Sequence, residues 1–188
     1  MVDIVVKVGG GLLAHPDHFE ATLATIGDAA RGRQLLIVPG GGPFADAVRR
    51  VNGQLALSDD AAHWMAVLGM DQYAQVLAER LARGLIVRDR DAVAAALEGD
   101  RLPVLAPFQW MHAVDPLPHS WDVTSDSIAA WVAGEVGARR LVLVKPPGAR
   151  RQGTDLVDAH FSDARPAAVE VIALDADQRT ALGRALDI

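Results

Sequence analysis

The stretch Val2-Asp3-Ile4-Val5-Val6-Lys7-Val8-Gly9-Gly10-Gly11 decides the fold class. Its first seven residues form a short segment rich in β-branched side chains. Such a segment predicts a buried strand, here followed by a glycine turn. A second unit of the same kind follows, Leu35-Leu36-Ile37-Val38-Pro39-Gly40-Gly41-Gly42. Such fully apolar strands are typical of a parallel sheet covered on both faces, which binds ligands at the carboxyl ends of its strands.

The rest of the chain alternates in the same way between apolar strands and amphipathic helices. Further strands are predicted at 85–87, 103–106, 141–144 and 169–172, and a loop at 107–121. Helices are predicted near 17–31, 43–52, 58–83, 90–98, 125–136 and 175–187, with Ser58 and Asp175 as N-caps. This order predicts an α/β fold, a three-layer αβα sandwich with a mostly parallel central sheet, as one domain over residues 1–188.

Composition excludes several classes of protein. The 188 residues carry a net charge of −6, which argues against a nucleic-acid partner. The absence of cysteine excludes disulfides and thiolate metal sites. No apolar run is long enough to span a membrane and no signal peptide is evident, so we expect no membrane partner and a cytoplasmic location. Of the 18 basic residues 16 are arginine, so the positions of the two lysines are informative.

The two glycine triplets are candidate phosphate-binding loops. Successive backbone N–H groups of such turns can surround phosphate oxygens, helped by the helix that follows. Neither triplet belongs to a Walker A motif or to the G-x-G-x-x-G dinucleotide motif. Each triplet taken alone is equally consistent with a tight turn. Together they predict phosphate contacts from Gly9, Gly10, Gly11, Gly40, Gly41 and Gly42.

Both lysines stand near the carboxyl ends of predicted strands. Lys7 lies two residues before the first glycine triplet, and Lys145 follows the strand at 141–144. An ammonium group there can reach a phosphate, although either side chain could instead simply extend into solvent. Asp126 lies in the first turn of a predicted helix, where it either favours the helix dipole or orients the lysines across a phosphate site.

These residues resemble the motifs of the amino acid kinase superfamily, in the order of that family and over nearly the whole chain. A further stretch is similar to the branch of aminomethylfuran phosphate kinases of methanofuran biosynthesis. The family motifs are Lys7-Val8-Gly9-Gly10, Pro39-Gly40-Gly41-Gly42-Pro43-Phe44-Ala45, Thr124-Ser125-Asp126-Ser127-Ile128-Ala129 and Leu143-Val144-Lys145. The branch stretch is Leu117-Pro118-His119-Ser120-Trp121-Asp122-Val123-Thr124-Ser125-Asp126.

The resemblance implies a kinase that uses ATP and Mg²⁺ to transfer the γ-phosphoryl group. It assigns Lys7, Asp126 and Lys145 to catalysis, with Asp126 aligning the lysines and Lys145 contacting ATP. Gly9 and Gly10 then hold the transferring phosphoryl group, and Gly41 and Gly42 hold the acceptor. The nucleotide is expected at Thr124, Ser125, Lys145 and Gly148, and no protein side chain is assigned to the metal.

The chain departs from the family pattern at two places. A C-terminal Gly-Gly-Met segment with a second catalytic lysine does not occur in the sequence, which leaves Lys145 as the candidate for that role. After the fifth strand, where many members read Thr-Asp-Val-Asp-Gly, this chain reads Lys145-Pro146-Pro147-Gly148. We therefore expect an altered nucleotide pocket.

The acceptor is expected to be a phosphate ester. No histidine stands beside either glycine triplet to act as a base for a hydroxyl acceptor, whereas a phosphate is already mostly ionised at pH 7. The resemblance favours [5-(aminomethyl)furan-3-yl]methyl phosphate, whose ring a tryptophan could stack on. The candidate acceptor-binding residues are His63, Arg50, Trp110 and His119, although core packing is an alternative for the tryptophan and a solvated helix face for the arginine.

Three other interpretations remain open at this point. The chain could be a kinase for another small phosphate or carboxylate, or a non-catalytic member of the fold that binds a nucleotide or an oxyanion. A nicotinamide-dependent oxidoreductase is disfavoured because the dinucleotide motif is absent. The resemblance also implies a homo-oligomer.

Overall fold

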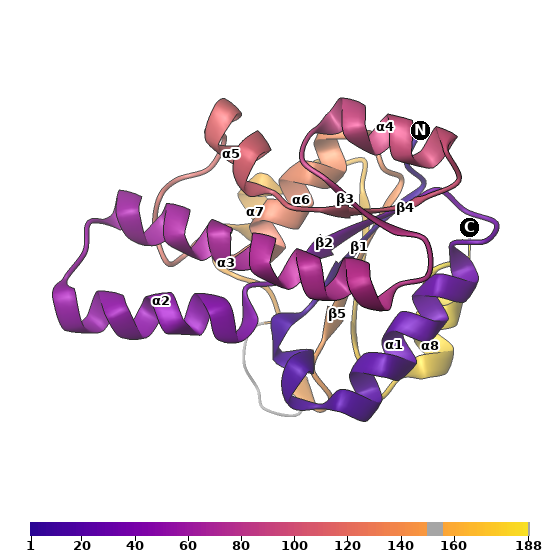
Figure 1. The fold of residues 1–188 in the computed structure, drawn as a ribbon, viewed down its shortest axis with the longest axis horizontal. Coiled ribbons are helices and arrows are strands. Elements are labelled where there is room, and N and C mark those ends of the chain that lie inside the picture. The colour runs from indigo at the N-terminus through magenta and orange to yellow at the C-terminus, as the bar shows by residue number, and fades with distance from the viewer. Residues whose placement is uncertain (150–155, 188) are drawn as a thin grey trace.

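The computed structural model describes residues 1–149 and 156–187, and its centre is one sheet of six parallel strands (Figure 1). The strand order is β3-β4-β2-β1-β5-β6. All six predicted strands are confirmed, with bounds β1 (Ile4–Val8), β2 (Leu35–Pro39), β3 (Gly84–Val87), β4 (Leu102–Leu105), β5 (Arg140–Lys145) and β6 (Glu170–Asp175). The chain passes from β1 to β2 on one side and later to β5 on the other, so β1 marks the point where ligands bind in such sheets.

Two layers of helices cover the sheet, which confirms the predicted αβα sandwich (Figure 1). One layer contains α4 (Arg90–Glu98), α5 (Phe108–Val114), α6 (Ser125–Glu135) and α7 (Phe161–Ala164). The other contains the 3₁₀ helix η1 (Gly10–Ala14), α1 (Pro16–Ala29), α3 (Asp59–Arg80) and α8 (Arg179–Ala185). Helix α2 (Gly42–Leu55) packs on α3, and both extend beyond the sheet (Figure 1).

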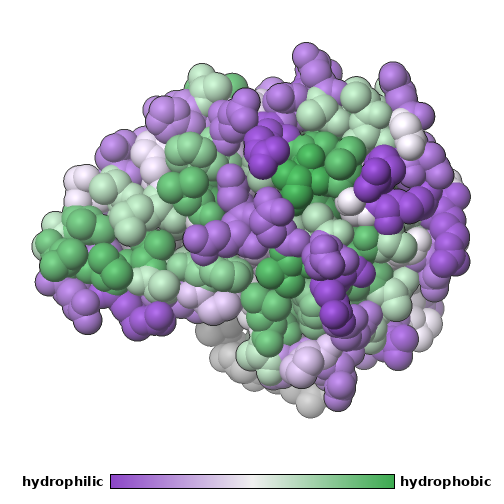
Figure 2. All heavy atoms as spheres, in the orientation of Figure 1, coloured by the Kyte–Doolittle hydropathy of each residue, from purple (hydrophilic) through white to green (hydrophobic). Residues whose placement is uncertain are grey.

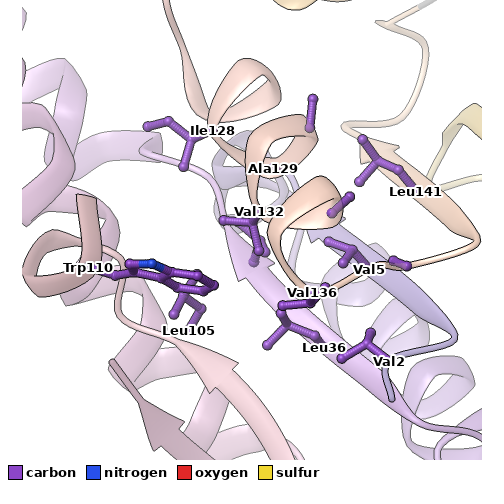
Figure 3. Close-up of a cluster of buried hydrophobic side chains, with 14 of the residues drawn as sticks. Val2, Val5, Leu36, Leu105, Trp110, Ile128, Ala129, Val132, Val136 and Leu141 are labelled. Atoms are coloured by element: carbon purple, nitrogen blue, oxygen red, sulfur yellow. The ribbon is translucent and has the colours of Figure 1, made fainter. Parts of the chain in front are cut away.

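Helix α6 is the most deeply buried helix of its layer. Figure 3 shows Val132 of this helix, and Val136 directly after it, close to Leu36 of the sheet. A helix that is apolar around most of its circumference is stable only in a core, and α6 has small or branched apolar residues on nearly every side. This packing sets the position of the α6 N-terminus at the edge of the sheet.

Two sequence expectations are wrong. The segment 107–121 is not all loop, because Phe108–Val114 forms α5 and buries Trp110 and Met111 in the core. Asp175 is not an N-cap but the last residue of β6, which continues to pair with β5 as far as Lys145. The last helix therefore begins only at Arg179. No helix of the described residues is long and apolar enough to cross a membrane.

Candidate active site

The sheet register places the two lysines side by side. Strands β1 and β5 are neighbours, and Lys7 lies opposite Leu143, two residues before Lys145. Because successive side chains of a strand alternate between faces, Lys7 and Lys145 point to the same face of the sheet. That face is the one covered by α6, since Leu143 belongs to the same core cluster as Val132.

The α6 N-terminus brings a carboxylate between these two lysines. Lys7 Nζ lies 2.9 Å from Asp126 Oδ1, and Lys145 Nζ lies 2.5 Å from Asp126 Oδ2. Lys7 is 5% exposed and Asp126 is 4% exposed. One buried and one partly buried cation thus share one anion, so the cluster retains a positive charge that favours an anionic ligand.

The same contacts set the protonation states of the cluster. Burial by itself raises the pKa of Asp126, but the charges of Lys7 and Lys145 outweigh it and the pKa lies below its usual value. Burial and repulsion from Lys7 lower the pKa of Lys145, against the attraction of Asp126. A buried carboxylate held ionised between two ammonium groups can orient both of them toward one phosphoryl group.

The two glycine loops touch each other at the end of the sheet. A Cβ atom on Gly10 would lie 2.2 Å from the backbone nitrogen of Gly42, and one on Gly40 would lie 2.6 Å from the nitrogen of Gly10. Gly42 also has a φ of 53°, in the left-handed region that favours glycine. The loops lead directly into η1 and into α2, whose first N–H groups are suited to an anion.

A cavity of about 220 Å³ opens beside these loops, between α2, α3 and the α6 N-terminus. Its inner end is formed by Gly10, Gly41 and Gly42. Small and apolar side chains of α3, together with Trp121, form its walls. At one end of the cavity the glycine backbone can contact a phosphate. The rest of the cavity is mostly apolar and suits a small organic group.

His63 lies on the wall of this cavity. Its ring also contacts the rings of Trp64 and His119. The residue is 7% exposed, and its Nε2 has no hydrogen-bond partner among the described residues. Its ring stacks on His119 with the centroids 4.3 Å apart. His119 itself does not line the cavity but pairs through Nδ1 with Asp60 at 2.9 Å and through Nε2 with Asp115 at 2.8 Å.

The stability of the protein should fall between pH 6.5 and pH 4 because of His63. Burial, followed by the charge of His119, lowers its pKa from 6.5 to about 4. In that range the His63 imidazole is protonated in the unfolded state and stays neutral in the folded state. Acidification therefore lowers the free energy of unfolding, by about 2 kcal/mol at pH 5. Urea unfolding at pH 7.5 and pH 5 should show this loss in the parent chain and in a control His15→Gln variant, whose histidine is exposed. An equal loss in His63→Gln would contradict the assignment.

The start of α6 depends on a residue that the sequence interpretation missed. Asp158 Oδ2 accepts hydrogen bonds from the backbone N–H and hydroxyl of Thr124, at 3.0 and 2.6 Å, and from the N–H of Ser127 at 3.1 Å. The hydroxyl of Ser127 donates to Asp158 Oδ1. This carboxylate therefore caps the helix that carries Asp126. Asp158 lies more than 30 residues along the chain from both partners, so no local signal identified it.

The structure brings most of the predicted site residues together at the carboxyl end of the sheet. Those at the cavity or the charged cluster are Lys7, Gly10, Gly41, Gly42, His63, Thr124, Ser125, Asp126 and Lys145. Gly9 and Gly40 lie directly behind the loops, with their N–H groups bonded to Val144 and Val8. Thr124 and Ser125, expected at the nucleotide, border the cavity.

Other predicted residues lie outside this cavity. Trp110 is in the core, with its ring centroid 5.1 Å from that of Trp131. Arg50 is exposed, whereas its neighbour Arg49 lines the cavity with its guanidinium 4.9 Å from the Trp121 ring. Gly11 sits against Pro146, and Gly148 occupies a left-handed turn just before the gap in the described residues.

The residues present fit a phosphorylated nucleotide better than a metal held by side chains. The glycine loops, where a Cβ atom would clash with backbone, lie next to the ammonium groups of Lys7 and Lys145. Together these groups form a donor set suited to phosphate oxygens. No group of three or more His, Asp or Glu side chains in the described parts of the chain could hold a metal ion. A magnesium ion would therefore take its ligands from phosphate oxygens and water.

Comparisons with known proteins identify the family of this chain. Residues 4–146 match the model of the amino acid kinase family. The chain is 27% identical over 143 residues to the [5-(aminomethyl)furan-3-yl]methyl phosphate kinase of Methanocaldococcus jannaschii, covering 74% of this chain. The match spans only 63% of the length of that relative.

Solved structures share the fold over almost the whole chain. The uridylate kinase of Archaeoglobus fulgidus has a TM-score of 0.70 at 15% identity, covering 96% of this chain and 95% of its own. The UMP kinase of Ureaplasma parvum has a TM-score of 0.71 at 15% identity, covering 94% and 91%. At this level of identity the likeness concerns the fold alone.

Proposed function

Because the chain belongs to the amino acid kinase family, we propose that it is a phosphotransferase that moves the γ-phosphoryl group of ATP to a phosphomonoester. A bond forms between an acceptor phosphate oxygen and the γ-phosphorus, and the bond from that phosphorus to the β–γ bridging oxygen breaks. The products are a diphosphate and ADP. The observation that carries the proposal is the pairing of both lysines with Asp126 beside the touching glycine loops.

Each part of the site has a role in this reaction. Phosphoryl transfer requires mainly positioning and neutralisation of charge on the equatorial oxygens. Lys7 and the N–H group of Gly10 would hold the transferring group, and Lys145 would bind the nucleotide phosphates. The N–H group of Gly9 is not available for this role, because it donates to Val144. Gly41 and Gly42 would hold the acceptor phosphate. Magnesium, when bound, supplies further neutralisation of the phosphate oxygens.

A phosphate acceptor agrees with the weakness of the bases near the cavity. His63 is the only histidine on the cavity wall in the described chain, and its pKa of about 4 makes it a poor proton acceptor. It also lies six residues from Gly69, which packs against Phe44 beside the loop, a separation of about 9 Å along α3. A phosphate oxygen needs no such base, since the second pKa of a phosphomonoester is about 6.

The curated relative suggests [5-(aminomethyl)furan-3-yl]methyl phosphate as the acceptor. The cavity offers a matching shape, because Trp121 stands on one wall and the small side chains Ala62 and Ala66 leave room on another. An aromatic wall of this kind can stack on a furan ring.

An ATP-consumption assay tests the proposal. We expect the purified chain with Mg²⁺ to convert this furan phosphate to its diphosphate, with kcat/KM at least about tenfold above the values for UMP, isopentenyl phosphate and acetylglutamate, because an unsuitable acceptor leaves polar groups of the cavity unpaired. Product formation is followed by ³¹P NMR, which distinguishes a diphosphate from an acyl phosphate. Phosphorylation of acetylglutamate alone would overturn the assignment to phosphate acceptors.

We also propose self-association through the outer face of α2 and α3. Figure 2 shows hydrophobic residues gathered over these two helices, and Leu55, Met65 and Leu68 are 67%, 37% and 42% exposed there. Apolar side chains clustered in this way mark interaction surfaces. Analytical ultracentrifugation should show a dimer or larger species that Leu68→Asp converts to monomer, whereas Leu85→Asp, at an exposed leucine of β3, leaves it assembled. A monomeric parent chain would refute this.

A further inference from the structure

We propose that the outer end of the cavity, at Asp59 and His63, is a binding site for a primary ammonium group of the acceptor. The proposal rests on the proposed function, since it takes the phosphate of the same molecule to lie at the glycine loops. It makes the acceptor a small zwitterion, with a phosphate at one end and a protonated amine at the other.

The inner end of the cavity is electropositive. It lies beside a cluster of two lysines and one aspartate, and the residues at the start of α2, Gly41 and Gly42, line it. Helix N-termini carry a partial positive charge. A phosphate therefore binds here, and the opposite end of the ligand points outward along α3.

The outer end has the opposite sign. Asp59 is the one acidic residue on the cavity wall, and its carboxylate makes no ion pair or side-chain hydrogen bond within the described residues. Behind it, Asp60 and Asp115 share a single histidine, His119. Four-residue spacing puts Asp59 and His63 on the same face of α3.

Arg49 does not cancel this charge. Its guanidinium donates to Asp46 at 2.9 Å and lies over the ring of Trp121. The arginine is thus already paired, whereas Asp59 is available to a ligand. A cation bound at this end would face the carboxylate of Asp59, which attracts positive charge.

His63 completes the site as a neutral hydrogen-bonding group. It is nine-tenths buried on the cavity wall, with an Nε2 that has no partner among the described residues. At neutral pH the imidazole is uncharged, because its pKa is about 4. With the proton on Nδ1, the Nε2 lone pair is left without a partner within the described chain, and no imidazolium charge repels an ammonium group that binds beside the ring.

The spacing fits a ligand built on one small ring. Gly69 packs against Phe44 and Ala45 at the start of α2, next to the glycine loop. From Gly69 to His63 the rise along α3 is about 9 Å, and to Asp59 about 15 Å. A phosphate at the loop and an amine across a five-membered ring span the first of these distances, which brings the amine to His63 with Asp59 one turn further out.

Calorimetric binding in the absence of nucleotide tests the site apart from catalysis. The two ligands are [5-(aminomethyl)furan-3-yl]methyl phosphate and its analogue with a methyl group in place of the aminomethyl group. We expect the parent chain to bind the amine about tenfold more tightly, and Asp59→Asn to remove most of that preference while leaving the analogue unchanged. Asp91→Asn, at the exposed first turn of α4, is the matched control and should keep the preference.

The outcomes separate this proposal from the kinase assignment. Equal affinity of the parent chain for both ligands, no binding of either, or an equal loss for both in Asp59→Asn would overturn the ammonium site. A preference for the amine without any phosphoryl transfer would support the ammonium site and reject the kinase function. Tighter binding of a neutral hydroxymethyl analogue than of the amine would show that His63 donates rather than accepts, and would also overturn the site.

Discussion

Replacement of Lys7 by methionine is expected to lower kcat by about 1,000-fold, the size of effect seen when one preorganised group that stabilises transition-state charge is removed. Lys7 is buried at the end of β1 with its ammonium group 2.9 Å from Asp126. Methionine keeps the apolar stem of the side chain and removes only the charge. Asp126 remains paired with Lys145, so no buried carboxylate is left alone.

Steady-state kinetics of the parent chain and the variant, with thermal melts of both, measure this effect. Arg80→Met is the control, because Arg80 is an exposed cation of α3 that pairs with Glu20. We expect it to retain parental kcat. A Lys7→Met variant that melts like the parent and turns over within tenfold of it would show that Lys7 is not catalytic. A parent chain that binds ATP without any turnover would instead favour the non-catalytic interpretation.

Replacement of Gly10 by alanine is expected to abolish activity and to lower the free energy of unfolding by about 3 kcal/mol, since overpacking strains a well-packed site. The new Cβ would lie 2.2 Å from the nitrogen and 2.3 Å from the Cα of Gly42. Both atoms belong to backbone, which cannot rotate away as a side chain could. The two loops must separate, and their N–H groups then no longer converge on one phosphate.

Gly27→Ala is the matched control. A Cβ on Gly27 meets nothing within 4 Å, and the residue lies inside α1. Alanine is the better helix former, so this variant should be more stable by about 1 kcal/mol and fully active. Urea unfolding and the ATP assay on both variants decide the matter. Parental activity in Gly10→Ala would mean that the contact between the loops has no part in phosphate binding.

The elements of the fold follow from local patterns in the sequence. Uniformly apolar runs such as Leu141-Val142-Leu143-Val144 indicate buried strands, and the sequence predicts all six strands, although β3 is only partly buried. The misassigned segments show what such patterns miss. The prolines on either side of α5 are typical of a loop, so the sequence does not predict this helix. The helix is stabilised by burial of Trp110 against Trp131. The sequence of β6 does not show that pairing with β5 extends this strand as far as Asp175. An aspartate before a helical segment therefore resembles an N-cap when it is judged from the sequence alone.

The residues of the candidate site were predictable to the extent that each sits at the end of its own strand or helix. Lys7, Lys145, Asp126 and the glycine triplets were found in this way. The acceptor side was predicted less well. Arg49 rather than Arg50 lines the cavity, because one residue of rotation along α2 changes the face that a side chain occupies. His119 lies in the loop after α5 and stacks on His63 instead of lining the cavity, a position that the loop sequence does not show.

The sequence by itself determined which groups this protein can offer, namely two lysines, one aspartate and two glycine turns at the ends of apolar segments. It also determined their faces, since alternation along a strand fixes the direction of each side chain. Only the tertiary structure decided that these groups meet. The β1–β5 register puts the two ammonium groups on one carboxylate, and Asp158 reaches across more than 30 residues to cap the helix that carries it. Such long-range pairing depends on the packing of whole elements, for which no local stretch of the chain holds the information.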